Sequence, residues 1–344
     1  SASRRDAMAP GEYTQPKTEK KSHSTWLFRF IQKEGDFHFS AMNSLPGQLL
    51  SRYSLDVFQG RLRAVTSGTW VEEAPLAGQK GENEDELPIE ERLILADNRL
   101  FILDEDMSIL SELKGIGQGE SLKSVRFQGD VAYAVTFLEV DPLFVLDLSD
   151  PENPAILGEL KIPGFSTYLH PVAPGRVLGL GYSVGMGVRQ GLKLSLFDVS
   201  DPTQPQELDN LILGAEYTDS PAARNPHAIT LDLKRGGAAF PIDYDNQFTY
   251  SLPGQEERAL APKGMDGWRG GAVISFEGDR LQLRQFVAWQ EGNVADWMDW
   301  ATEPDRRFAY IDDILYFLDG KTITALDFDS YEQTGKADLF PGIN

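Results

Sequence analysis

The segment Gly181-Tyr182-Ser183-Val184-Gly185 matches the G-x-S-x-G pattern that carries the nucleophilic serine of many hydrolases. In those enzymes the serine sits on a sharp turn between a strand and a helix. A strand-like apolar run does precede Ser183, but the glycines that follow it would not begin a helix. We therefore interpret residues 183–191 as a flexible loop, and the same glycines lack the βαβ setting of a dinucleotide-binding loop.

Acidic side chains offer a second chemistry, the binding of a hard cation. Asp243 and Asp245, next to Asn246, could supply oxygen ligands to calcium, although their spacing is not that of an EF-hand. The acidic run 82–91 reads as a solvated loop. A zinc site built on His170 and His227 would lack the third and fourth ligands that zinc requires.

A third chemistry is the binding of an anion through guanidinium forks and imidazole donors. Five basic side chains lie at or near the start of apolar runs, and they are Arg52, Arg126, His170, His227 and Arg307. The alternative is that they pair with acids such as Glu139, Asp141 and Asp243 and tie neighbouring elements together. The choice depends on the elements that position them.

Those elements are visible between residues 141 and 213, where one unit occurs twice. The copies are DPLFVLDLSDPENPAILGELKIPG and GLKLSLFDVSDPTQPQELDNLILG, with Asp147 and Asp198 in equivalent places. Each copy has a short apolar run, a Ser-Asp-Pro turn and a second apolar run, which is the pattern of a β-hairpin buried on both faces. A hairpin repeated every roughly 40–50 residues indicates the blades of a β-propeller.

The chain resembles a family of predicted secreted proteins with a C-terminal β-propeller domain, distantly similar to WD-repeat propellers. The resemblance rests on segments that include LLSRYSLDVFQGRLRAVTS (49–67), SVRFQGDVAYAVTFLEVDPLFVLDLSDPENP (124–154), GFSTYLHPV (164–172) and NPHAITLDL (225–233). It implies an all-β fold and a secreted or periplasmic location, but no reaction.

We expect a polar N-terminal arm over residues 1–24 and a propeller of four-stranded antiparallel blades over residues 25–344. A hairpin over 25–42 would be followed by five four-stranded units, which cover 51–113, 124–161, 166–213, 228–287 and 307–338. That makes about five and a half blades. We therefore expect an upstream segment, in the same or a separate chain, to complete a ring of about seven or eight blades.

Loop lengths distinguish the two faces of this propeller. The turns between strands one and two and between strands three and four are short. The other connections, among them 67–91, 183–191, 243–270 and 289–306, hold most of the irregular sequence, and we call their side the long-loop face. Innermost strands begin on this face, so the five basic residues should ring the mouth of the central channel there.

Aromatic residues also gather toward the long-loop face, where a protein or carbohydrate partner could bind them. These are Tyr182, Tyr244, Trp268 and Trp289. The alternative is that they cover the ends of the blades and form a small core.

Charge limits the partners. The chain has 53 acidic and 32 basic residues, a net charge of −21, which argues against nucleic acid or an anionic membrane surface. There is no cysteine, and no apolar run is long enough to span a bilayer. The sequence favours an exported binding or assembly module that acts through the long-loop face, with no cofactor other than calcium. The alternative is a hydrolase or lyase at the channel mouth around Arg126, His170 and His227.

Overall fold

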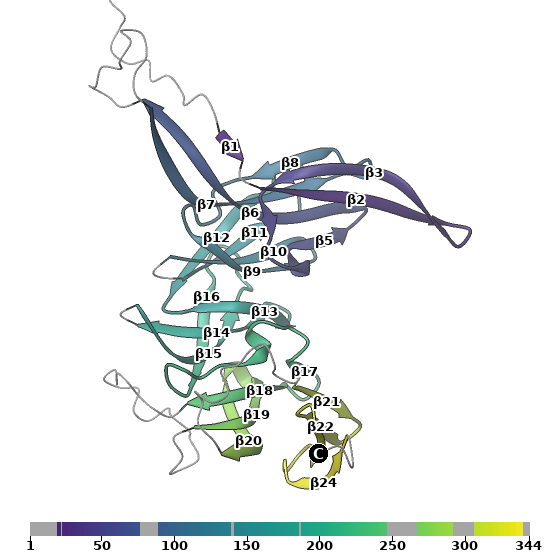
Figure 1. Cartoon of the computed structure of the whole chain (residues 1–344), viewed down its shortest axis with the longest axis vertical. Coiled ribbons are helices and arrows are strands. Elements are labelled where there is room, and N and C mark those ends of the chain that lie inside the picture. The colour runs from purple at the N-terminus through teal and green to yellow at the C-terminus, as the bar shows by residue number, and fades with distance from the viewer. Residues whose placement is uncertain are drawn as a thin grey trace, which may run out of the picture.

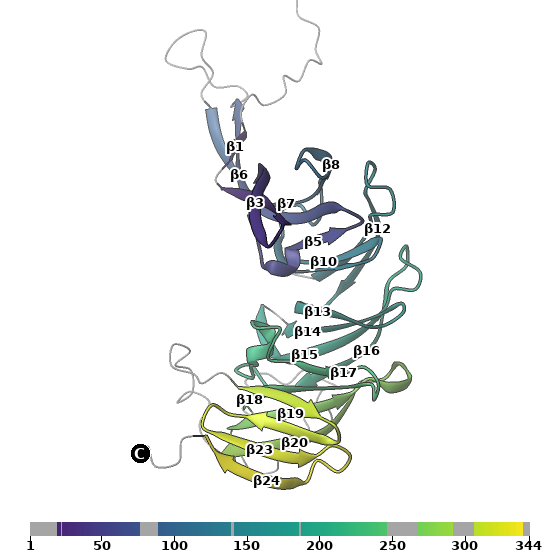
Figure 2. The same cartoon turned by 90° about the vertical axis from the view of Figure 1, so that its right-hand side faces the viewer.

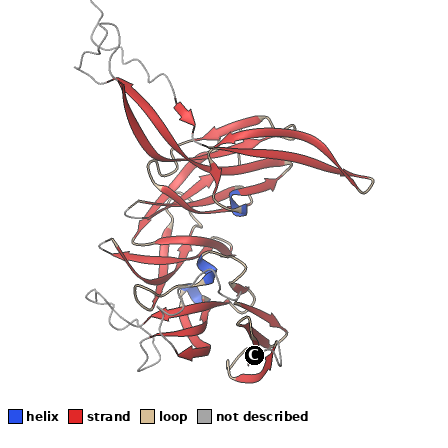
Figure 3. Cartoon of the chain, viewed as in Figure 1, coloured by secondary structure: helices blue, strands red, loops and turns tan. Residues whose placement is uncertain are grey.

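The computed structural model describes residues 19–21, 23–75, 89–138, 141–185, 187–245, 267–291 and 306–339. Strands dominate this part of the chain, and its helices are three short 3-10 turns, η1 (Arg52–Ser54), η2 (Pro221–Ala223) and η3 (Glu277–Asp279) (Figure 3). No helix in the described part is long and apolar enough to cross a membrane.

Five antiparallel sheets follow one another along the chain and form an open arc (Figures 1 and 2). The first consists of β5 (Leu55–Phe58), β6 (Arg61–Pro75), β7 (Ile89–Leu103) and β8 (Ile109–Leu113), with the short strands β1 (Glu19–Lys21) and β4 (Gln48–Leu49) also on β6. The second consists of β9 (Ser121–Gln128), β10 (Val131–Phe137), β11 (Asp141–Asp147) and β12 (Ala155–Ile162).

The remaining sheets repeat this order. The third consists of β13 (Phe165–Ala173), β14 (Arg176–Gly185), β15 (Val188–Asp198) and β16 (Gln206–Leu213). The fourth consists of β17 (Thr230–Asp232), β18 (Gly237–Asp245), β19 (Gly267–Ser275) and β20 (Gln282–Glu291). The fifth consists of β21 (Arg307–Ile311), β22 (Ile314–Leu318), β23 (Thr322–Asp327) and β24 (Gln333–Asp338). The predicted four-stranded blades are confirmed, and we number them one to five.

A separate hairpin of β2 (Ser24–Lys33) and β3 (Asp36–Pro46) precedes the first blade. It lies at the same end of the arc as that blade, far from the fifth (Figures 1 and 2). Glu19–Lys21, within the segment expected to be an arm, pair with Glu72–Trp70 of β6.

The central strands of the second to fourth blades are buried on both faces because each of these blades packs between two neighbours. In β10, Ala132 and Ala134 face a cluster that includes Val65 and Leu100 of the first blade, whereas Tyr133 and Val135 belong to a cluster with residues of the third. This explains the continuous apolar runs of the sequence, since a strand with one solvated face would alternate. At roughly 25 cal/mol per Å² of apolar surface buried, these contacts between blades are the main source of stability.

The repeated Ser-Asp-Pro turns have the predicted structure. Asp147 and Asp198 each accept a hydrogen bond at 2.9 Å from the backbone N–H two residues later. Asp150 and Asp201 do the same at 3.0 Å. Each turn also reaches the preceding blade: the Ser111 hydroxyl donates to the Pro151 carbonyl at 2.6 Å, and a Cβ at Gly158 would lie 2.4 Å from the Pro202 carbonyl oxygen.

On the long-loop face, several paired strands are longer than predicted and extend into segments that the sequence assigned to loops. β6 and β7 stay paired out to Pro75 and Ile89, and β14 and β15 out to Gly185 and Val188. β18 continues to Asp245 and β19 begins at Gly267. The prediction that these flanks are loops is therefore wrong, and residues 76–88, 246–266 and 292–305 lie outside the described part.

Candidate functional site

A cavity of about 460 Å³ lies among the inner strands of consecutive blades. Its walls come from Leu50–Tyr53 before β5, Lys123–Val125 of β9, Thr167–Leu169 of β13, and Ala223, Arg224, Pro226 and His227 before β17. We call it the mouth cavity. Its lining residues on β9 and β13 are the third to fifth of each strand. Arg126 and His170 are each the sixth residue of their strand, so the prediction that they lie at inner-strand starts is wrong.

Basic side chains surround this cavity. Arg52, Lys123, Arg224 and His227 line it, and no aspartate or glutamate is among its described lining residues. Arg224 is bound to Asp219, with 2.5 Å between Nη1 and Oδ2. No carboxylate of the described residues lies within salt-bridge distance of Arg52, Lys123 or Arg126. Glu139 and the Asp141 side chain, two of the acids considered as their partners, lie outside the described part.

Aromatic rings hold these cations in place. The Arg52 and Arg126 guanidinium carbons lie 4.9 and 5.0 Å from the centre of the Tyr53 ring. Arg52 also donates to the Tyr53 hydroxyl at 2.8 Å. Lys123 lies 5.7 and 5.5 Å from the rings of Phe137 and Phe165. A cation–π contact positions a guanidinium or ammonium group and leaves N–H donors of that group available to a ligand.

Tyr168 and His170 stand on the same face of β13, two residues apart, beside this cluster. Tyr168 packs edge-on against Tyr53, with ring centres 6.3 Å apart. Its hydroxyl lies 2.6 Å from His170 Nδ1. Burial, and then the positive charge of Arg126, lowers the pKa of His170 to about 4, and burial raises the pKa of Tyr168 to about 12. At neutral pH the imidazole is therefore uncharged, and which of the two groups donates depends on which ring nitrogen carries the proton.

The structure brings most of the predicted basic residues together. Arg52 and His227 line the mouth cavity, and Arg126 and His170 are joined to it through Tyr53 and Tyr168. Arg307 begins β21 in the fifth blade and is not among the lining residues. Sequence reasoning missed Tyr53, Lys123 and Tyr168, although Tyr168 could have been found from its position two residues before His170 in an inner strand.

Three predicted surface aromatics are buried, so their assignment to the surface is wrong. Tyr244 stacks on Trp268 with ring centres 5.0 Å apart, and Tyr182 donates its hydroxyl to Asp219 at 2.5 Å. They form part of the core between the third and fourth blades. The strands extend farther than predicted, which carries these rings into the sheets. Trp289 lies in β20, but its side chain is outside the described part.

The candidate metal ligands have other contacts. Asp243 is buried, with Arg269 Nε 2.9 Å from Oδ1 and Arg306 Nη2 2.6 Å from Oδ2. Asp245 accepts from the backbone N–H of Tyr217 at 3.2 Å. The described residues contain no group of three acidic or histidine side chains that could hold a metal ion. Two guanidinium groups on Asp243 supply the positive charge that calcium would bring, so the calcium prediction has no support in this geometry.

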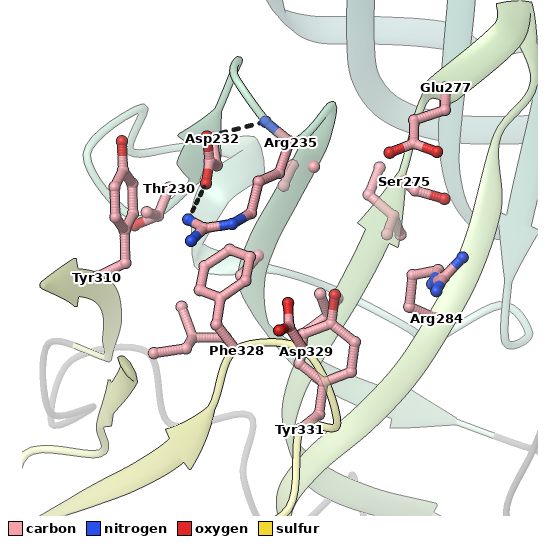
Figure 4. Close-up of a pocket in the computed structure, with 16 residues that line it drawn as sticks. Thr230, Asp232, Arg235, Ser275, Glu277, Arg284, Tyr310, Phe328, Asp329 and Tyr331 are labelled. Atoms are coloured by element: carbon pink, nitrogen blue, oxygen red, sulfur yellow. Dashed lines mark hydrogen bonds and ion pairs between the residues drawn. The ribbon is translucent and has the colours of Figure 1, made fainter. Parts of the chain in front are cut away.

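A second cavity, of about 310 Å³, lies between the fourth and fifth blades on the opposite face (Figure 4). Arg235 bridges the two blades, with 2.9 Å to Asp232 and 2.6 Å to Asp313. Its guanidinium carbon also lies 4.5 Å from the centre of the Phe328 ring. Asp232, Glu277 and Asp329 balance the basic side chains of this cavity, so its charge selects no class of ligand.

Comparisons with known proteins agree with the architecture. An uncharacterised protein of Archaeoglobus fulgidus is 37% identical over 320 residues, which are 93% of this chain and 39% of that protein. An uncharacterised protein of Methanocaldococcus jannaschii is 40% identical over 191 residues, 55% of this chain and 26% of that protein. The chain thus spans well under half the length of these relatives.

Solved structures similar to this chain include AztD from Citrobacter koseri, at 13% identity and a TM-score of 0.45, covering 92% of this chain and 80% of that one. The C-terminal WD40 domain of Sif2 is similar at 8% identity and a TM-score of 0.40, covering 94% and 68%. The model of the β-propeller domain family matches residues 8–331. The chain belongs to the β-propeller domain family.

Proposed function

We propose that this chain is a binding module that holds a small anion, bearing carboxylate or phosphate groups, in the mouth cavity. One observation carries the proposal: Arg52, Lys123 and Arg126 gather there without a carboxylate partner among the described residues, in a chain with 53 acidic side chains. Cations with a purely structural role would be expected to bind some of those acids, because like charges held together repel.

The shape of the cavity supports a ligand with a flat or extended body. Tyr53 and Tyr168 form part of its walls, and both rings are fixed by contacts with their neighbours. Guanidinium groups supply forked donors that suit carboxylate and phosphate oxygens, and Lys123 adds a point charge. A volume of about 460 Å³ lies within the range of small-molecule sites.

An enzyme at the same place, a hydrolase or lyase using Arg126, His170 and His227, is the weaker candidate. It is favoured by the imidazole of His170, which is uncharged at neutral pH and could accept a proton. However, Nδ1 already contacts the Tyr168 hydroxyl, and no carboxylate lines the cavity among the described residues to orient a base. A binding role needs neither a base nor its partner acid.

We further propose that a protein or carbohydrate partner meets the long-loop face and that the module acts outside the cytoplasm, as the resemblance to secreted propeller proteins implies. Strands project from this face, above all β6 with β7 (Figure 1), and enlarge the surface available to a partner. A rigid sheet scaffold with projecting hairpins is a common arrangement for recognition.

Calorimetric titration with pyrophosphate and with citrate tests the anion site. Arg126→Ala and Arg52→Ala should each weaken binding by roughly 10–100-fold, the effect of losing a hydrogen bond between charged groups. The matched control is Lys161→Ala, on the exposed outer strand β12, which should change affinity less than about twofold.

Equal losses in all three variants, or no binding of either anion by the unaltered chain, would contradict the proposal. Turnover of an ester or anhydride probe that His170→Gln abolishes would instead support the enzyme.

A further inference from the structure

The hairpin of β2 and β3 presents an unusually apolar surface to solvent. Trp26, Phe28 and Phe30 alternate along β2 and therefore share one face, and the pairing places side chains of β3 opposite them on that face. The six large apolar side chains of this face are 48–74% exposed, and they are Trp26, Phe28, Phe30, Phe37, Phe39 and Met42. We call this set the aromatic face. Patches of this kind mark interaction surfaces.

The other face of the hairpin packs on the first blade as one blade packs on another. Leu27 and Leu45 are buried in a cluster with Ala64, Phe101 and Leu103 of that blade. The Asn43 side-chain amide donates to the Met107 carbonyl at 2.7 Å, which holds the hairpin against the outer part of the sheet. The hairpin thus continues the arc of blades (Figure 2).

The connection from the hairpin shows which strands of a blade it represents. β3 leads through β4 and η1 to β5, the innermost strand of the first blade, as the outermost strand β12 leads to the innermost strand β13. β2 and β3 therefore occupy the third and fourth places of a blade. Among the described strands β2 has only β3 as its neighbour, which leaves its inner edge open.

The first blade has an uncovered area at the matching position. Val57 of β5 lies on the same side of the sheet as Leu55, which packs on the cluster under the hairpin, yet Val57 is 68% exposed. The hairpin covers the outer strands of the first blade, while part of the innermost strand stays open. Two strands added to the inner edge of β2 would lie over it.

We infer that another part of the same polypeptide adds two inner strands to β2 and packs a further propeller blade on the aromatic face. The matched region makes up 39% and 26% of the two archaeal relatives, so proteins of this kind have ample additional chain. The complementary face must be apolar, because every described junction between blades is an apolar cluster. A second copy of this chain and an unrelated protein are the competing occupants.

Thiol labelling distinguishes these occupants, because the chain has no cysteine of its own. Phe28→Cys probes the aromatic face, Val57→Cys probes the open area of the first blade, and Leu233→Cys is an exposed control in the fourth blade. Each is made in the 344-residue chain and in the native full-length polypeptide. We expect all three thiols to react rapidly in the 344-residue chain, and those at 28 and 57 to react at least about tenfold more slowly in the native polypeptide.

Equal labelling of Cys at position 28 in both proteins would overturn the inference. Protection in the 344-residue chain that rises with protein concentration, together with a dimer in sedimentation, would assign the face to a second copy and overturn it as well. Protection at 28 without protection at 57 would contradict the added inner strands. If Phe28→Cys fails to fold, Met42→Cys on the same face replaces it.

Discussion

Two groups of arginines can be compared, one around Asp243 in the fourth blade and one around Tyr53 between the first and second. In the first group Arg269 and Arg306 both contact the buried Asp243 carboxylate, and Arg306 is itself almost fully buried. In the second, Arg52 and Arg126 lie on an aromatic ring and remain partly open to solvent.

This difference distinguishes arginines that stabilise the fold from arginines that can bind a ligand. A buried guanidinium needs a carboxylate, because the free energy of removing it from water is otherwise uncompensated. A partly exposed guanidinium keeps its hydration and can exchange it for the oxygens of a ligand. Asp243 thus makes Arg269 and Arg306 part of the core. The Tyr53 ring leaves the guanidinium groups of Arg52 and Arg126 available to a ligand.

The largest expected effect is the loss of Asp243. Asp243→Ala leaves two guanidinium groups in a buried environment without their shared carboxylate and should lower the free energy of unfolding by about 3–5 kcal/mol. Urea unfolding followed by circular dichroism measures it. A change below about 1 kcal/mol would show that the Asp243 cluster is hydrated and would remove the distinction between the two groups.

The pH dependence of stability should be governed in part by His170. Its pKa is about 4 in the folded state, against an ordinary value near 6.5 in the unfolded chain, so between these values the unfolded chain binds the extra proton. Stability should therefore fall as pH drops from about 6.5 to 4, by up to roughly 3 kcal/mol from this group. Unfolding midpoints across this range, compared with those of His170→Gln, measure the contribution. A parallel pH profile in the variant would assign the effect to other groups.

A smaller effect is expected at the turns on the opposite face. Pro151→Gly or Pro202→Gly should lower the free energy of unfolding by about 0.5–1 kcal/mol, because glycine frees the unfolded chain, without changing pyrophosphate affinity. Unfolding curves and calorimetry on the same samples provide both values. A loss of affinity at unchanged stability would mean that ligands bind on the opposite face.

The smallest expected effect on stability is at the mouth cavity itself. Arg126→Ala should change the free energy of unfolding by less than about 0.5 kcal/mol, since Arg126 has no ion pair among the described residues and repulsion from Arg52 is relieved. The same unfolding assay applies, with Asp243→Ala as its matched opposite. A loss of 2 kcal/mol or more would give Arg126 a structural role like that of Arg306.

The blades could be predicted from the sequence because their signal is local. Apolar runs of strand length and the turns at Asp147 and Asp198 each depend on consecutive residues, and the structure contains them as predicted. The ends of β18 and β19 could not be predicted, because charges at Asp243 and Asp245 are typical of a loop. Asp243 can lie in a strand because Arg306 binds its carboxylate. Arg306 is 63 residues away in the chain, so no local sequence pattern shows this contact.

The mouth cavity was predictable in part for the same reason. The approach of Arg52 and Arg126 follows from the order of strands, which places the inner strands of neighbouring blades side by side, but Arg126 lies near the end of β9 and not at its predicted start. The Tyr53 ring between them could not be predicted from that order, because it depends on the direction of a side chain in the short turn η1.

The turn contacts described above also bear on how the chain acquires its structure. The hydroxyl of Ser111 in the first blade is bound by Pro151 of the second, 40 residues later, and Gly158 of the second lies against Pro202 of the third. At these two junctions each blade is thus held by the blade that follows it in the chain. Such an array is suited to ordering from the first blade onward as it leaves the ribosome, with each new blade extending a surface already formed.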